Sequence, residues 1–129
     1  MRAFFLWLGV SAVVWGGAAF GLDRYFGARP ATVLVVVDTA FAMEGDWAAV
    51  GPLLDRIDNA SYSQFALMGP RGPIHGPEAA LSLGATQAYG TRDLSAVSGF
   101  GAGADRKILV TNAPDGELPD LPGWEVLRP

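Results

Sequence analysis

Apolar residues along the chain fall into one long run and several short ones. The long run, Phe4 to Leu22, contains no charged residue. A helix needs roughly 20 such residues to cross the hydrocarbon core of a bilayer, so this run predicts a transmembrane helix. Tyr25 and Phe26 follow it, where aromatic rings are typical of the membrane interface. We therefore divide the chain into residues 1–30, an anchor and linker, and residues 31–129, a folded domain.

The apolar run has an alternative interpretation as a cleaved signal peptide, because residues 16–19 are small enough for a peptidase. We expect an uncleaved, single-pass anchor. We also expect an extracytoplasmic domain, because the very short N-terminal segment is typical of a signal anchor, although Arg24 and Arg29 alone favour the opposite orientation. Gly17 and Gly21 have the spacing that allows two membrane helices to pack closely.

The short apolar runs predict an α/β domain. Residues 32–37 are almost all apolar, as in a strand covered on both faces of a parallel sheet. An apolar stripe at helical spacing follows Asp46, a candidate N-cap, and Pro52 lies within that helix. Further strands are expected at 65–68, 73–75 (an edge strand), 107–110 and 124–127, with short helical turns at 79–83 and 93–97. This order indicates a mostly parallel sheet with flanking helices.

Charge and composition exclude some functions. The chain has a net charge of -4 and no cysteine, which excludes disulfides and thiolate metal sites. Beyond residue 30, six basic side chains stand against twelve acidic ones. Such an acidic domain is a poor partner for nucleic acid, whose phosphates need a basic surface. The preference for arginine over lysine suggests a bacterial source.

Polar residues stand at the ends of two of the predicted strands. Asp38 follows the first apolar strand, and Thr111 and Asn112 follow the strand at 107–110. In open α/β sheets, ligands bind at the carboxyl ends of the strands. If the two strands are neighbours, these polar residues face one crevice.

Three segments of the chain, taken in order, resemble the metal-ion-dependent adhesion site of the von Willebrand factor A domain. Asp38-Thr39-Ala40-Phe41-Ala42 is similar to the family's D-x-S-x-S, Gly90-Thr91-Arg92-Asp93-Leu94 to its threonine loop, and Thr111-Asn112-Ala113 to its T-D-G run. The resemblance covers residues 32–127 and implies a von Willebrand factor A-like (Rossmann-like) fold, abbreviated relative to the family.

The departures from the family pattern affect the metal ligands. Ala40 and Ala42 replace both serines, and Asn112 replaces the aspartate, so only Asp38 and Thr91 remain. Such a site has too few oxygen ligands to hold Mg²⁺. We therefore expect no metal and no cofactor, with Asp38 serving as a structural remnant. In this interpretation the Asn112 amide donates to Asp38.

Two functions follow from these observations. The first is a noncatalytic, membrane-anchored accessory protein that docks its degenerate domain on another membrane protein or complex, as the resemblance to a family of binding modules implies. The alternative is an enzyme similar to the haloacid-dehalogenase phosphatases, using Asp38 with Thr111. That family's first motif is D-x-D, whereas the third residue here is Ala40.

Overall fold

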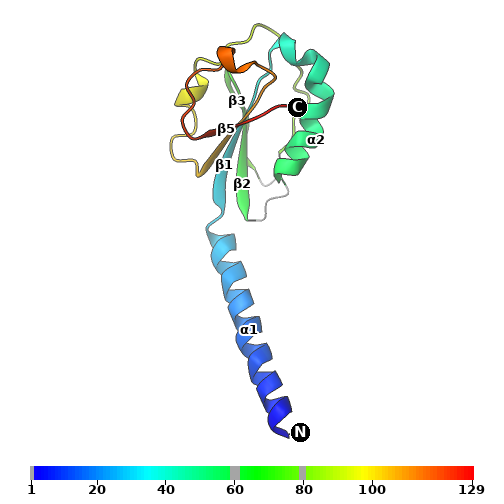
Figure 1. The fold of residues 1–129 in the computed structure, drawn as a ribbon, viewed down its shortest axis with the longest axis vertical. Coiled ribbons are helices and arrows are strands. Elements are labelled where there is room, and N and C mark those ends of the chain that lie inside the picture. Colours follow the sequence, from blue (N-terminus) through cyan, green and yellow to red (C-terminus); the bar gives the residue numbers. More distant parts are fainter. Residues whose placement is uncertain (1, 59–61, 79–80) are drawn as a thin grey trace. The chain divides into compact units, whose positions relative to one another are not determined.

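The fold is described from a computed structural model that covers residues 2–58, 62–78 and 81–129. Contacts between residues divide the chain into two compact units, Met1–Pro30 and Ala31–Pro129. The first unit is a single helix and the second contains a five-stranded sheet (Figure 1).

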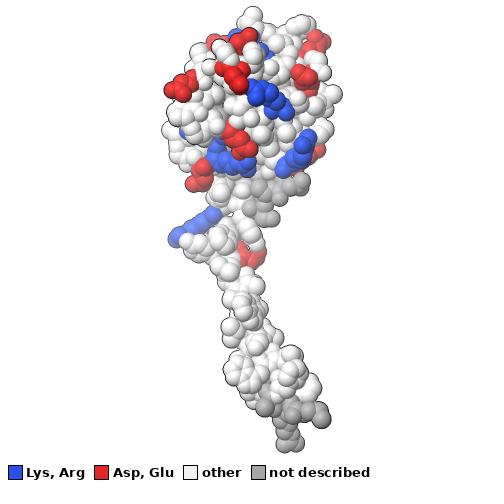
Figure 2. Space-filling model, in the orientation of Figure 1, with Lys and Arg blue, Asp and Glu red and all other residues white. Residues whose placement is uncertain are grey.

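The first unit is helix α1, Arg2–Ala28. At about 1.5 Å per residue, its 27 residues extend about 40 Å. Its segment Phe4–Ala28 has a mean hydropathy of 1.7, and none of it is buried. This helix is long and apolar enough to cross a membrane, and Figure 2 shows that most of its length carries no charge. Among the described residues, no atom outside the backbone of α1 lies within 4 Å of a Cβ placed at Gly17 or Gly21, so their role in helix packing stays a prediction.

The sheet of the second unit has the strand order β3-β2-β1-β4-β5. Strands β1, β2, β4 and β5 run parallel, and β3 pairs antiparallel with β2 at one edge. The domain is therefore α/β with a mostly parallel sheet, as predicted. The strands are β1 Ala31–Val37, β2 Ser63–Gly69, β3 Gly72–Glu78, β4 Arg106–Val110 and β5 Trp124–Leu127.

The central position of β1 explains its unbroken apolar sequence. Val33, Val35 and Val37 point into the core on one face of the sheet, while Leu34 and Val36 point into the core on the other. Because alternate side chains enter opposite faces and both faces are covered, every position from 33 to 37 needs an apolar side chain.

The two faces of the sheet are covered differently (Figure 1). One face packs against helix α2, Trp47–Asp58, whose buried side chains follow the predicted stripe, and Pro52 lies inside this helix without ending it. The other face is covered by loops and by the short 3-10 helix η2, Val97–Gly99. A further 3-10 helix, η3, Asp115–Glu117, has no buried residue. The expected helices therefore flank only one face of the sheet within the described residues.

Short segments around the sheet differ from expectation in detail. The predicted turn at 93–97 is replaced by η2, which starts at its last residue. Of the turn predicted at 79–83, residues 79–80 lie outside the described residues and 81–83 are not helical. Gly101 has φ +72°, and a Cβ there would lie 2.6 Å from Leu34 Cδ2. Only glycine allows the loop to approach the sheet this closely.

Candidate functional site

Asp38 lies at the carboxyl edge of the sheet, directly after β1. Its amide donates to the Val110 carbonyl (2.9 Å), which extends the pairing of β1 with β4 by one residue. From β1 the chain passes through α2 to β2 on one side, whereas β4 lies on the other side. Asp38 thus occupies the point where strand connections diverge, the usual ligand crevice of an open α/β sheet.

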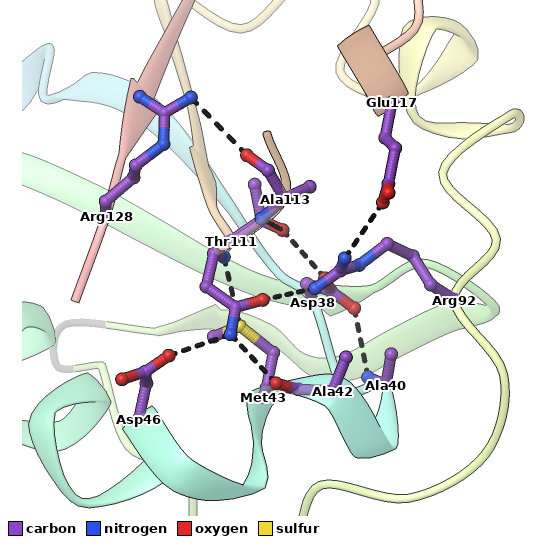
Figure 3. A network of polar contacts seen from close by, with 11 residues as sticks. Asp38, Ala40, Ala42, Met43, Asp46, Arg92, Thr111, Ala113, Glu117 and Arg128 are labelled. Atoms are coloured by element: carbon purple, nitrogen blue, oxygen red, sulfur yellow. Dashed lines mark hydrogen bonds and ion pairs between the residues drawn. The ribbon is translucent and has the colours of Figure 1, made fainter. Parts of the chain in front are cut away.

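The Asp38 carboxylate is fully buried and accepts three hydrogen bonds (Figure 3). The Ala40 amide donates to Oδ1 (3.0 Å). The Thr111 hydroxyl and the Arg92 Nε–H both donate to Oδ2 (2.7 Å each). Thr111 is also fully buried, and its Oγ1 accepts from the Ala113 amide (3.1 Å). These contacts join the ends of β1 and β4 and satisfy both oxygens of the buried carboxylate.

The Arg92 guanidinium is surrounded by oxygen acceptors from three segments of the chain. Besides Asp38, it donates through Nη2 to the Asn112 side-chain oxygen and through Nη1 to Glu117 Oε2 (3.2 Å). The Arg92 side chain is 17% exposed, so its charge pairs with Asp38 largely out of water. A rigid, permanently charged fork suits such an environment, because each of its three nitrogens meets an acceptor.

Asn112 connects the end of β4 to the 3-10 helix η1, Phe41–Asp46. Its side-chain amide donates to the Ala42 carbonyl (2.8 Å) and to Asp46 Oδ2 (2.7 Å), and its backbone amide lies 3.1 Å from Met43 Sδ. The predicted donation from Asn112 to Asp38 is wrong, because the amide hydrogens point to η1 and Arg92 bridges the two residues instead. Asp46, the candidate N-cap of α2, is the last residue of η1 and accepts this amide.

The other residues predicted for the remnant site lie at the same edge but play different parts. Ala40 is buried and contributes its amide to Asp38, and Ala42 is exposed and contributes its carbonyl to Asn112. Thr91 is exposed and is not among the described partners of Asp38. The next residue, Arg92, donates to Asp38.

Sequence reasoning missed Arg92, although the signal was present. Arg92 stands inside the segment Gly90–Leu94 that was selected for its threonine. Backbone pairing brings this segment beside the residues that follow β1: the Tyr89 amide donates to the Thr39 carbonyl (2.7 Å) and the Phe41 amide to the Gly90 carbonyl (2.8 Å). Arg92 therefore lies at the end of the strand that is followed by the buried Asp38, where it can serve as the counter-ion.

The arrangement limits what Asp38 can do chemically. A carboxylate that acts as a nucleophile or as a metal ligand needs a free lone pair directed at its target. Here both oxygens hold hydrogen bonds, and the guanidinium supplies the positive charge that a cation would bring. These three hydrogen bonds use most of the acceptor positions of the carboxylate, and Asp38 has no exposed surface from which to reach a substrate.

Comparisons of the chain with protein-family models, with curated proteins and with solved structures give no match. The resemblance to the von Willebrand factor A domain stays a prediction.

Replacing Asn112 with aspartate is expected to destabilise the folded unit by about 1–3 kcal/mol, because the Ala42 carbonyl and the Asp46 carboxylate both lose their donor. The new carboxylate would also face the Asp46 carboxylate, which now accepts from Asn112 at 2.7 Å. Chemical denaturation of the full chain in detergent micelles measures the effect. Asp46→Asn in the same chain exchanges donor and acceptor in one of the two contacts and should restore part of the stability. Equal stability of Asn112→Asp and the unmodified chain would contradict this role of Asn112.

Proposed function

We propose that this chain is a noncatalytic, membrane-anchored accessory protein whose domain docks on another membrane protein or complex. The observation that carries the proposal is the Asp38–Arg92 ion pair (2.7 Å). The crevice in which an open α/β sheet binds its ligand is occupied by the protein's own cation. In this proposal the carboxyl edge of the sheet, where a ligand would otherwise bind, has a structural role.

The ion pair also supports descent from a von Willebrand factor A-type domain. Loss of the ligand hydroxyls at Ala40 and Ala42 leaves a buried carboxylate without its metal, and a buried charge needs a partner. Arg92 is such a partner, and it reaches the Asp38 and Asn112 oxygens from the segment that resembles the family's threonine loop. A degenerate site of this kind suits a binding module that works without a metal or cofactor.

The remaining parts of the proposal rest on α1 and on charge. An uncleaved α1 tethers the domain to the bilayer, on the extracytoplasmic side, so that its partner is reached at the membrane surface. The twelve acidic and six basic side chains beyond residue 30 make nucleic acid an unsuitable partner.

One contact in the structure supports the phosphatase alternative, and two observations oppose it. Thr111 lies 2.7 Å from Asp38, as that alternative requires. However, the Asp38 side chain has no exposed surface, and Arg92 donates to one of its oxygens. A nucleophilic carboxylate must instead face its substrate.

The proposal is tested by chemical crosslinking in native membranes of the full chain carrying a C-terminal tag, followed by quantitative mass spectrometry. The matched control keeps residues 1–30 and replaces the domain with an unrelated soluble protein. We expect a stoichiometric membrane partner for the full chain and none for the control. A solitary chain that hydrolyses an aryl phosphate, with activity lost in Asp38→Asn, would replace the proposal with the phosphatase alternative.

A further inference from the structure

Two exposed aromatic residues lie on neighbouring backbone segments at the carboxyl edge of the sheet. In the described part of the folded unit, the large hydrophobic residues that are strongly exposed are Phe41 (62%), Tyr62 (45%) and Tyr89 (67%). Phe41 and Tyr89 lie on the two segments that pair through backbone hydrogen bonds beyond β1. Exposed aromatic side chains are enriched at binding surfaces.

A cavity of about 310 Å³ opens beside Tyr89. It lies between the turn that joins β2 to β3 and the segment that carries Thr86 and Tyr89. The cavity combines an aromatic ring, two threonines, apolar side chains and one arginine. Its lining residues are Thr39, Gly69, Arg71, Gly72, Pro73, Ile74, Thr86 and Tyr89.

Arg71 brings a positive charge to this cavity and forms no ion pair with the carboxylates that the structure describes. Its guanidinium carbon lies 6.0 Å from the Tyr89 ring centroid, and no described carboxylate lies within 4.0 Å of it. Three other arginines of the folded unit are paired with Asp38 and Glu117, with Glu125 and with Asp115. Gly90, at φ +85°, leaves room for Arg71, because a Cβ there would lie 3.0 Å from Nη2.

Asp93 lies close enough to Arg71 for a weak electrostatic interaction but forms no ion pair with it. The pKa of Asp93 is lowered, first by hydrogen bonds from the Ser95 hydroxyl and amide and to a smaller extent by Arg71. Its Oδ1 accepts both Ser95 hydrogen bonds, so this carboxylate is held within its own loop. The Arg71 guanidinium thus stays available to an external carboxylate.

We propose that the cavity beside Arg71 and Tyr89 binds an extended segment of a partner protein that carries an acidic residue next to an apolar one. The carboxylate pairs with Arg71, and the apolar side chain packs on Tyr89 and Phe41. Arginine and tyrosine are the residue types that contribute most to binding at interfaces. The net negative charge of the domain repels an acidic segment elsewhere, which confines binding to this position. The inference rests on the proposed docking function and names its surface.

The test uses the full chain in nanodiscs of neutral lipid and short fluorescent peptides that differ only in glutamate or glutamine beside a leucine. We expect the glutamate peptide to bind about tenfold more tightly than the glutamine peptide. Arg71→Gln should abolish this preference, and Tyr89→Ala should weaken both peptides. The matched control is Arg56→Gln, which removes an exposed arginine from α2 and should leave the preference intact.

Several outcomes would overturn the inference. A preference for glutamate that persists in Arg71→Gln, or no preference in the unmodified chain, removes the acidic segment as the occupant. Binding of inorganic phosphate or anionic vesicles in place of peptide assigns Arg71 to a small anion or a lipid. Self-association that is lost in Arg71→Gln assigns the surface to a second copy. If Arg71→Gln still crosslinks to the membrane partner, the partner binds at another surface, and only the further inference fails. If the unmodified chain crosslinks to no partner, the proposed docking function fails as well.

Discussion

Replacing Arg92 with methionine is expected to destabilise the folded unit by about 3–5 kcal/mol, because it leaves the buried Asp38 carboxylate without its counter-ion. Methionine keeps much of the side-chain volume, so the loss comes mainly from charge and hydrogen bonding. The Asn112 oxygen and Glu117 lose a donor in the same substitution. A cost of this size is a large part of the 5–15 kcal/mol that is typical of a whole domain.

Chemical denaturation of the full chain in detergent micelles measures this loss, with Trp47 and Trp124 as reporters inside the folded unit. Arg106→Met is the matched control, because its ion pair with Glu125 (2.6 Å) is solvent-exposed and is expected to contribute about 0–1 kcal/mol. Asp38→Asn combined with Arg92→Met removes both charges and should recover part of the stability. If Arg92→Met costs no more than Arg106→Met, Arg92 is not the counter-ion that stabilises the site.

Replacing Ile108 with alanine is expected to cost about 2–5 kcal/mol, because it opens a cavity in a fully buried part of the core. Ile108 has no exposed surface, lies beside Val35 in the sheet register and belongs to the core cluster beneath α2. Thermal unfolding in the same micelles gives the effect as a shift in Tm. Ile108→Val should cost only about 0.5–1.5 kcal/mol. A negligible shift for Ile108→Ala would contradict the placement of β4 in the core.

The strands could be predicted because each one carries a short-range signal. β1 and β4 have apolar runs that fit burial on both faces, and Pro73 in β3 fits an edge strand. The cover on the second face could not be predicted in the same way. Leu94 and Val97 are buried there, but they belong to loops and a three-residue helix, where apolar side chains follow no period of two or 3.6.

The site could be predicted only as far as strand ends determine it. Asp38 and Thr111 meet because β1 and β4 are parallel neighbours, a pairing that the two apolar runs allowed but did not establish. The choice between Thr91 and Arg92 depends on how a loop without regular structure turns its side chains. That choice is fixed by backbone hydrogen bonds between residues 89–90 and residues 39–41. These segments are about 50 residues apart, and no local sequence pattern predicts their pairing.

The position of β1 in the middle of the sheet has a consequence for synthesis of the chain on the ribosome. β1 can pair with β2 early, but its other partner, β4, begins only at Arg106. At roughly 5–20 residues per second, the stretch after Gly69 takes several seconds to appear. During that interval the most apolar strand of the nascent domain has one unpaired edge, and it has to be shielded from neighbouring nascent chains until Arg92 and β4 arrive.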